Sequence, residues 1–139
     1  MAVTTWIRTH YPHMMADEAR IWTKFLETTE LKFERVIYDL HLGAGIPGTP
    51  GEPEFMKVLK SAVTRKRVDA VGETADTIWI FEVKPRVGMS ALGQLINYFE
   101  LYQQEYRPIK PVKLAAIGER EAPDIRTTYG LYGVDIIIV

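Results

Sequence analysis

The chain of 139 residues contains no cysteine, which excludes disulfide bonds and thiolate metal sites and favours a reducing compartment. It also lacks a long apolar run: the last one, residues 136–139, is far too short to span a bilayer. Residues 1–15 carry Arg8, His10 and His13 without the apolar stretch of a secretory signal. We therefore expect a protein without membrane contact that is not secreted and acts in the cytoplasm of a cell or infected host.

The chain has almost no net charge, because its basic and acidic residues nearly balance and leave a formal net charge of −1. A strongly basic balance, common in nucleic-acid-binding domains, is therefore missing. The distribution is uneven, however, because residues 57–67 contain no acid and five basic residues: Lys57, Lys60, Arg65, Lys66 and Arg67. This run is either a solvated surface or a set of contacts to phosphate.

The hydrophobic fraction of 47% and the charged fraction of 25% are ordinary for a globular protein. A chain of this length suits one domain spanning residues 1–139. In the first half, apolar residues at helical spacing predict a helix over 17–29, and alternation predicts a strand over 34–42 with Val36, Tyr38, Leu40 and Leu42 on one face. Glycine and proline mark residues 43–53 as a loop, and a short helix over 54–62 follows.

In the second half, residues 67–72 and 77–84 predict two strands around a turn at 73–76. Ser90 is the expected N-cap of a long helix that runs to about Tyr106. Two apolar strands, 112–118 and 134–139, are expected to be covered on both faces, with a short helix at 124–131 between them. The order predicts an α/β protein with a mixed central sheet flanked by helices.

Two charged residues end the strand predicted at 77–84. Glu82 and Lys84 are two apart and therefore share a face, with Ile78 and Ile80 before them and Trp79, Phe81 and Val83 opposite. A strand-end pair of opposite charges is common, and taken alone it is more simply structural.

A third residue, Asp69, favours a functional interpretation of this pair. A hairpin around the turn at 73–76 would place its carboxylate next to that of Glu82. Two adjacent carboxylates repel each other unless a cation compensates, and their hard oxygens favour Mg²⁺ or Mn²⁺. An ammonium at Lys84 would steady the charge that develops in phosphoryl transfer.

The segments Arg67-Val-Asp-Ala-Val-Gly72 and Ile80-Phe-Glu-Val-Lys84 resemble the PD-(D/E)XK nuclease superfamily. The resemblance extends from the first helix to the strand at 112–118 and implies a restriction-endonuclease-like core in the order α-β-β-β-α-β, to which this chain adds a C-terminal strand. Gln94 and Tyr98 match the Gln-x-x-x-Tyr motif of the RecB-like branch, which includes small resolvase-like members. One departure is that Val68, not proline, precedes Asp69.

The resemblance implies roles for these residues. Asp69, Glu82, Lys84 and Gln94 would be catalytic, and Glu18, on the apolar stripe of the first helix, would join Asp69 and Glu82 at a Mg²⁺ or Mn²⁺ ion. For Glu18, a simple ion pair at the helix rim is an equally good interpretation. Contacts to nucleic acid are expected from Lys57, Lys60, Arg65, Lys66, Arg67 and Tyr98. His10 and His13 lie near the N-terminus and are interpreted as surface residues. Asp39 and His41 could reach the site from the strand over 34–42, although a solvent-facing strand edge is the simpler interpretation.

The expected function is hydrolysis of DNA phosphodiester bonds, directed by DNA structure or by a partner, with a homodimer or larger nucleic-acid-processing complex as the assembly. The alternative on the same fold is a catalytically silent DNA-binding protein or a phage or mobile-element assembly protein. Retention of all three core residues, Asp69, Glu82 and Lys84, favours the enzyme, whereas the near-neutral charge favours the alternative.

Overall fold

The computed structural model describes residues 6–45, 47–64 and 66–139. Its centre is a five-stranded sheet in the order β1-β2-β3-β5-β7. The strands are β1 (Arg35–Leu42), β2 (Lys66–Glu73), β3 (Ile78–Val83), β5 (Val112–Gly118) and β7 (Val134–Ile138). The first three run antiparallel to their neighbours and the last three run parallel, so the predicted mixed sheet and the hairpin of β2 and β3 are confirmed.

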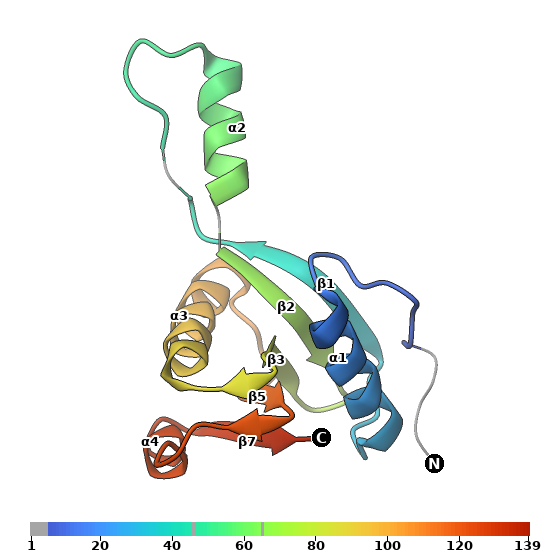
Figure 1. The fold of residues 1–139 in the computed structure, drawn as a ribbon. Coiled ribbons are helices and arrows are strands. Elements are labelled where there is room, and N and C mark those ends of the chain that lie inside the picture. The colour runs from blue at the N-terminus through green and yellow to red at the C-terminus, as the bar shows by residue number, and fades with distance from the viewer. Residues whose placement is uncertain (1–5, 46, 65) are drawn as a thin grey trace.

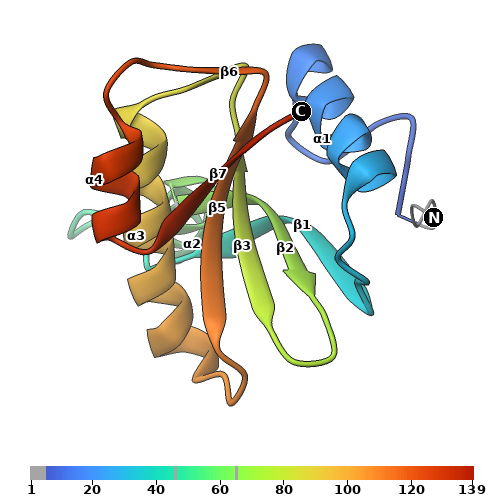
Figure 2. The ribbon, with the colours of Figure 1, turned by 90° about the horizontal axis from the view of Figure 1, so that it is seen from below.

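Helices cover both faces of this sheet, as Figures 1 and 2 show. Helix α1 (Ala16–Thr28) lies on one face, and α3 (Met89–Tyr106) and α4 (Arg126–Leu131) lie on the other. Each face carries its own cluster of buried apolar side chains, one beneath α1 and one beneath α3 and α4. The result is the predicted three-layer arrangement. None of the helices in the described ranges is long and apolar enough to cross a membrane.

Helix α2 (Glu54–Thr64) is confirmed, but the start of α3 corrects a prediction. The N-cap is Gly88, so Ser90 lies inside the helix. The chain enters α3 directly from β4 (Arg86–Val87), which pairs with β6 (Arg120–Glu121) in a second small sheet. Strands of two residues leave no alternating pattern, and the sequence therefore gave no sign of them.

Strand β1 departs from simple alternation. Val36 and Tyr38 pack in the cluster beneath α1, whereas Leu40 and Leu42 pack in the cluster beneath α3, so the prediction of one shared face is wrong. Between the two halves, Asp39 has a φ of 52°, in the left-handed region that aspartate tolerates better than most residues. The strand changes face at this residue, and the paired strand β2 changes face beside it, since Val68 packs beneath α3 and Ala70 beneath α1.

The last strand is also less covered than expected. β5 is buried along most of its length, but β7 lies at the edge of the sheet and keeps Ile136 and Ile137 only partly buried. An unbroken apolar run alone does not distinguish a central strand from an edge strand that packs on both faces.

Phe81 occupies the centre of the cluster beneath α1. Its ring centroid lies 5.3 Å from that of Trp22, 5.2 Å from Phe25, 5.9 Å from Phe33 and 5.8 Å from Trp79. Phe81 is fully buried. This contact set fixes α1 against the strand that carries Glu82, the next residue.

We expect Phe81→Ala to lower the free energy of unfolding by about 3–5 kcal/mol, because it leaves a cavity among four aromatic rings. Ile109 is fully exposed, and Ile109→Ala should change stability by less than about 0.5 kcal/mol. Urea denaturation of both variants measures the two effects. Equal loss in both would show that the aromatic cluster does not carry the stability assigned to it.

Candidate active site

A cleft of about 450 Å³ opens at the end of the sheet, between the start of α1 and the helix α3. Side chains from the N-terminal segment, α1, β2, β3 and α3 line it: His13, Met14, Met15, Glu18, Arg67, Asp69, Glu82, Lys84, Gln94 and Tyr98. The cleft therefore brings together all the residues predicted to be catalytic or to hold a metal. These come from segments far apart in the sequence.

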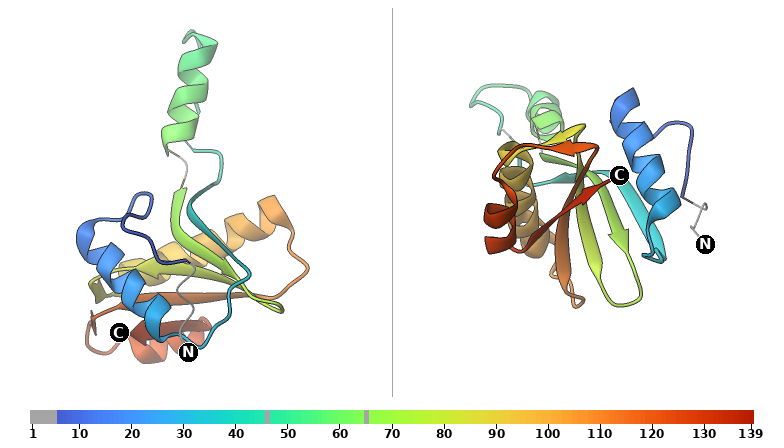
Figure 3. Two further views of the ribbon diagram at one scale, coloured as in Figure 1. Left: turned by 90° about the vertical axis from the view of Figure 1, so that its right-hand side faces the viewer. Right: turned by 60° about the horizontal axis from the view of Figure 1, so that its bottom comes forward.

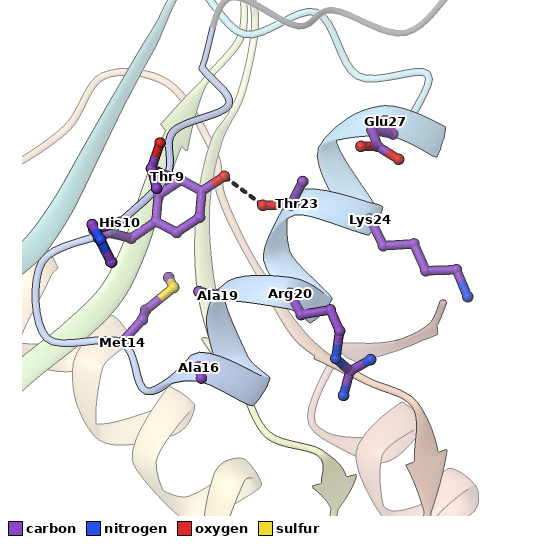
Figure 4. A pocket seen from close by; sticks show the side chains of 10 residues that line it. Thr9, His10, Met14, Ala16, Ala19, Arg20, Thr23, Lys24 and Glu27 are labelled. Carbon is purple, nitrogen blue, oxygen red and sulfur yellow. Dashed lines mark hydrogen bonds between the residues drawn. The ribbon is translucent and has the colours of Figure 1, made fainter.

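A larger groove of about 660 Å³ runs between the N-terminal segment and α1 (Figure 4). There the Tyr11 hydroxyl bonds Thr23 Oγ1 at 2.7 Å, which fastens the segment to the helix. The charged side chains along this groove, such as Arg20, Lys24 and Glu27, are exposed. The groove lacks the paired carboxyls of the smaller cleft, so the smaller cleft is the better candidate site.

Asp69 and Glu82 lie next to each other because of the hairpin register. Ala70 pairs with Phe81, and one step further along the two strands sets Asp69 opposite Glu82. Asp69 Oδ2 accepts a hydrogen bond of 2.8 Å from the Val83 N–H. Glu82 is only 4% exposed, and its Oε2 is buried without a hydrogen-bond partner among the described residues.

Both carboxyls have raised pKa values. Burial raises the pKa of Glu82 to about 8, and the charge of Asp69 adds to this, whereas Lys84 opposes it. Burial also raises the pKa of Asp69, against the Val83 N–H that stabilises its charged form. Two carboxyls held so closely share a proton or require a cation between them. The pair is thus short of positive charge.

Lys84 supplies part of that charge. Its Nζ lies 3.8 Å from Glu82 Oε1, and about a third of its side chain is exposed to the cleft. The Lys84 N–H donates to the Ile117 carbonyl at 2.9 Å, which extends the pairing of β3 with β5 beyond the strand end. Gly118 leaves room for this turn, since a Cβ there would lie 2.5 Å from the Lys84 carbonyl oxygen.

Gln94 and Tyr98 face the carboxyls from α3. Gln94 Nε2 donates to the Tyr98 hydroxyl at 3.4 Å, as their spacing of one helical turn allows. Burial, with the nearby charge of Glu82, raises the pKa of Tyr98. Gln94 Oε1 is buried and has no hydrogen-bond partner among the described residues. The cleft therefore holds two unpartnered buried acceptors, one on β3 and one on α3.

The rim of the cleft is formed by Glu18, Arg67 and His13. Glu18 Oε1 accepts a long hydrogen bond of 3.4 Å from the Met15 N–H. Arg67 Nη1 lies 2.8 Å from His13 Nδ1, which must accept because a guanidinium only donates. Arg67 Nε also lies 3.9 Å from Asp39 Oδ1.

The sequence carries no pattern that places His13 at the cleft. Asp39 could be expected near the site from its place on the strand, although a solvent-facing edge was the simpler interpretation. His13 lines the cleft from the N-terminal segment, which the Tyr11 hydroxyl fastens to α1. Asp39 lies behind the rim, 3.9 Å from Arg67, on a left-handed backbone. Both are consequences of the tertiary arrangement.

The basic run is divided between two places. Arg67 lines the cleft, while Lys66 begins β2 as an exposed residue. Lys57 and Lys60 lie on α2, and Lys60 Nζ bonds Glu52 at 2.8 Å. Arg65 lies outside the described residues. Of the described residues in this run, Arg67 alone lines the cleft.

The acidic side chains do not form a closed metal cage. Within the described ranges, no three histidine, aspartate or glutamate side chains converge in a way that would hold a metal ion. Asp69 and Glu82 instead offer a pair of carboxylates that faces an open cleft, with Glu18 at its rim. Such a pair suits Mg²⁺, which is commonly held by one or two carboxylates and keeps several waters.

The fold is of the restriction-endonuclease-like α/β class. Among solved structures, the chain is similar to EndoMS in complex with double-stranded DNA, with a TM-score of 0.54 and 17% identity over 95% of this chain and 48% of that chain. EndoMS in its apo form gives a TM-score of 0.50 and 19% identity, over 91% of this chain and 47% of that chain. A repair endonuclease from Pyrococcus abyssi gives a TM-score of 0.43 and 18% identity, over 70% of this chain and 39% of that chain.

The chain thus spans about half the length of the EndoMS structures it matches. At these identities the likeness concerns the fold. No protein-family model matches the sequence. No curated protein matches it either.

The raised pKa values predict a dependence of stability on pH. A folded state with raised acid pKa values binds more protons than the unfolded chain, so its stability falls as pH rises. We expect the free energy of unfolding, measured in EDTA, to fall as the pH rises from about 4.5 to about 8. These limits are the ordinary pKa of Glu82 and its raised pKa in the folded protein. Glu82→Gln should remove most of this fall.

Urea denaturation at several pH values across this window measures the effect. Glu30→Gln, at an exposed position on the same chain, is the control and should follow the wild type. The assignment fails if Glu82→Gln loses stability with pH as steeply as the wild type does.

Proposed function

We propose that the protein is a metal-dependent nuclease that hydrolyses phosphodiester bonds in DNA, with Mg²⁺ or Mn²⁺ as its cofactor. The observation that carries this proposal is the pair of the partly buried Asp69 and the buried Glu82, which is short of positive charge and faces an open cleft beside Lys84. A structural ion pair would not need a second carboxylate or an unpartnered Glu82 Oε2.

The two carboxylates fit a divalent ion. Asp69 and Glu82 would hold it through hard oxygen ligands, and Glu18 at the rim would add a third acidic group nearby. When bound, such an ion polarises the phosphodiester and lowers the pKa of the attacking water. Its charge would also relieve the repulsion that raises the pKa of Glu82.

The other residues act on the substrate. The Lys84 ammonium, exposed to the cleft, would lie against the phosphate oxygens and offset the negative charge that grows as the bond breaks. Gln94 would hold the attacking water through its unpartnered Oε1, while its amide group donates to the Tyr98 hydroxyl. The same acceptor that is costly in the free protein thereby gains a donor.

Contacts to the DNA backbone are proposed for Arg67 and His13 at the rim, with Lys57, Lys60, Arg65, Lys66 and Tyr98 as further candidates. Arg67 is the best placed, because it lines the cleft that holds the carboxylates. EndoMS, whose fold the chain shares, has been solved with double-stranded DNA, which supports DNA as the partner. We further propose that cleavage is directed by DNA structure or by a partner, within a homodimer or a larger complex.

The activity is tested with plasmid, single-stranded, forked and four-way-junction DNA in Mg²⁺, Mn²⁺ or EDTA. We expect metal-dependent cleavage that Lys84→Ala and Asp69→Asn each reduce by at least about 10²-fold, since each removes charge from the reacting centre. Lys32→Ala, at an exposed lysine, should leave the rate unchanged. Absence of cleavage on every substrate, or equal cleavage by all variants, contradicts the nuclease and favours a silent DNA-binding protein.

The rim is tested separately by DNA binding in EDTA at several salt concentrations. We expect Arg67→Ala to weaken binding and to reduce the slope of log affinity against log salt by about one, the value for one lost phosphate contact. His13→Ala should weaken binding less, because it removes the acceptor that positions Arg67. His10→Ala, three residues away, is the matched control. A slope that Arg67→Ala leaves unchanged would rule out this contact.

A further inference from the structure

The pairing of β1 with β2 continues beyond the hairpin that carries the two carboxyls. β2 pairs with β3 only as far as Ala70 with Phe81, whereas its pairing with β1 runs on through residues 66–68, opposite residues 40–42. These two stretches form a two-stranded extension past the end of β3, which we call the ribbon (Figures 1 and 3). The ribbon carries Arg67, which lines the cleft.

The ribbon is turned over relative to the sheet from which it extends. On β1 the change of face lies between Tyr38, which packs beneath α1, and Leu40, which packs beneath α3. The residue between them is Asp39, with its left-handed φ of 52°. The register is the same on both sides of this break and sets Asp39 opposite Asp69, although these two residues are not themselves paired.

The carboxylate of Asp39 faces Arg67. Its Oδ1 lies 3.9 Å from Arg67 Nε, and its Oδ2 lies 3.4 Å from His41 Nε2. The Asp39 side chain is 21% exposed, and Oδ1 is buried without a hydrogen-bond partner among the described residues. A buried carboxylate oxygen requires a donor, and the Arg67 Nε–H is the cationic donor beside it.

The guanidinium of Arg67 is held from two sides. Nη1 lies 2.8 Å from His13 Nδ1, on the N-terminal segment, while Nε faces Asp39 on β1. Among the described residues, Nη2 has neither a hydrogen bond nor an ion pair. A guanidinium has five N–H groups in a rigid fork, so two holds fix its plane and leave Nη2 for a ligand.

We propose that Asp39 is a positioning residue, which holds the guanidinium of Arg67 so that Nη2 meets a phosphate of the bound DNA. The phosphate in this inference rests on the proposed function, whereas the hold on Arg67 does not. Because Asp39 lies opposite Asp69 in the strand register, the same backbone position also relates Arg67 to the carboxyl pair.

The charge of Asp39 is otherwise unfavourable at this place. A carboxylate behind the rim of a DNA site repels the phosphate backbone and reduces the attraction that Arg67 supplies. Asparagine or glycine would also tolerate the left-handed backbone, without the charge. Residues held in such sparsely populated backbone regions cluster at functional sites. Orientation of Arg67 gives the carboxylate a role that offsets its repulsion.

The first test measures the order of Arg67 in the free protein, without DNA or metal. NMR relaxation of its Nε–H group, assigned from the signal that Arg67→Lys removes, gives an order parameter. We expect a value above about 0.6 in the wild type and a lower value in Asp39→Asn. Glu119→Gln is the matched control, because it removes the partner of Arg20 and should lower the order of Arg20 alone. Equal order of Arg67 in the wild type and Asp39→Asn overturns the inference.

The second test measures DNA affinity in EDTA through a double-mutant cycle. Loss of a carboxylate near the rim would by itself strengthen DNA binding. We expect the reverse, with Asp39→Asn weakening binding by about twofold to fivefold, the range that a partly exposed ion pair supports. In the Arg67→Ala background the same change should not weaken binding, because the guanidinium that it positions is gone. Unchanged or stronger binding in Asp39→Asn, or an equal loss in both backgrounds, overturns the inference.

Asp39→Gly is the second variant, because the amide oxygen of asparagine can still accept a hydrogen bond from Arg67. Glycine adopts a φ of 52° readily, so the strand keeps its change of face, and circular dichroism verifies the fold. We expect the order of Arg67 and the DNA affinity to fall at least as far as in Asp39→Asn. Wild-type values of both in Asp39→Gly overturn the role of the carboxylate.

Failure of this inference is distinct from failure of the proposed chemistry, because neither test uses metal or cleavage. A protein that cuts no DNA, but in which Asp39→Asn lowers both the order of Arg67 and the affinity, contradicts the nuclease and supports the role of Asp39. Metal-dependent cleavage by a protein in which Asp39→Asn leaves Arg67 equally ordered supports the nuclease and overturns the positioning.

Discussion

Repulsion between two adjacent carboxyls, the buried Glu82 and the partly buried Asp69, is the constraint on which the candidate site depends. Asp69 and Glu82 stand opposite each other because a short hairpin fixes their register. Burial then removes the water that would screen them, and the pKa of Glu82 rises to about 8. A fold selected only for stability would replace one of them with an apolar residue. Their coexistence gives the cleft a lasting affinity for positive charge.

The rest of the protein supports this pair from both faces of the sheet. The aromatic cluster around Phe81 holds β3 against α1, and α3 presents Gln94 and Tyr98 from the opposite side. Lys84 follows the end of β3, where Gly118 admits its backbone. The chemical groups thus lie where the sheet ends and both helical layers remain within reach. Solvent has access at this point, and substrate would have it too.

Much of this arrangement follows from sequence. The alternation in residues 77–84 and the turn at 73–76 were enough to place Asp69, Glu82 and Lys84 together, because a strand period of two and a tight turn leave few alternatives. The place of Gln94 and Tyr98 at the site was implied by the family resemblance, and helical spacing put the two side chains on one face. The place of His13 could not be predicted, since it depends on how the N-terminal segment docks. Asp39 could be expected near the site from its strand, but its left-handed backbone could not. The prediction of Ser90 as the N-cap was wrong, because α3 begins at Met89 with Gly88 as its N-cap, directly after the two-residue strand β4.

Residues 47–64 form an insertion between β1 and β2. The pairing of these two strands breaks at Asp39 but resumes and continues to Leu42 and Lys66, so the insertion lies at the tip of a hairpin. The free energy of closing such a loop grows only slowly with its length. Lineages can therefore lengthen, shorten or exchange this segment while the sheet and its carboxyls keep their register. The inserted segment and the candidate site can in this way change at different speeds within one small protein.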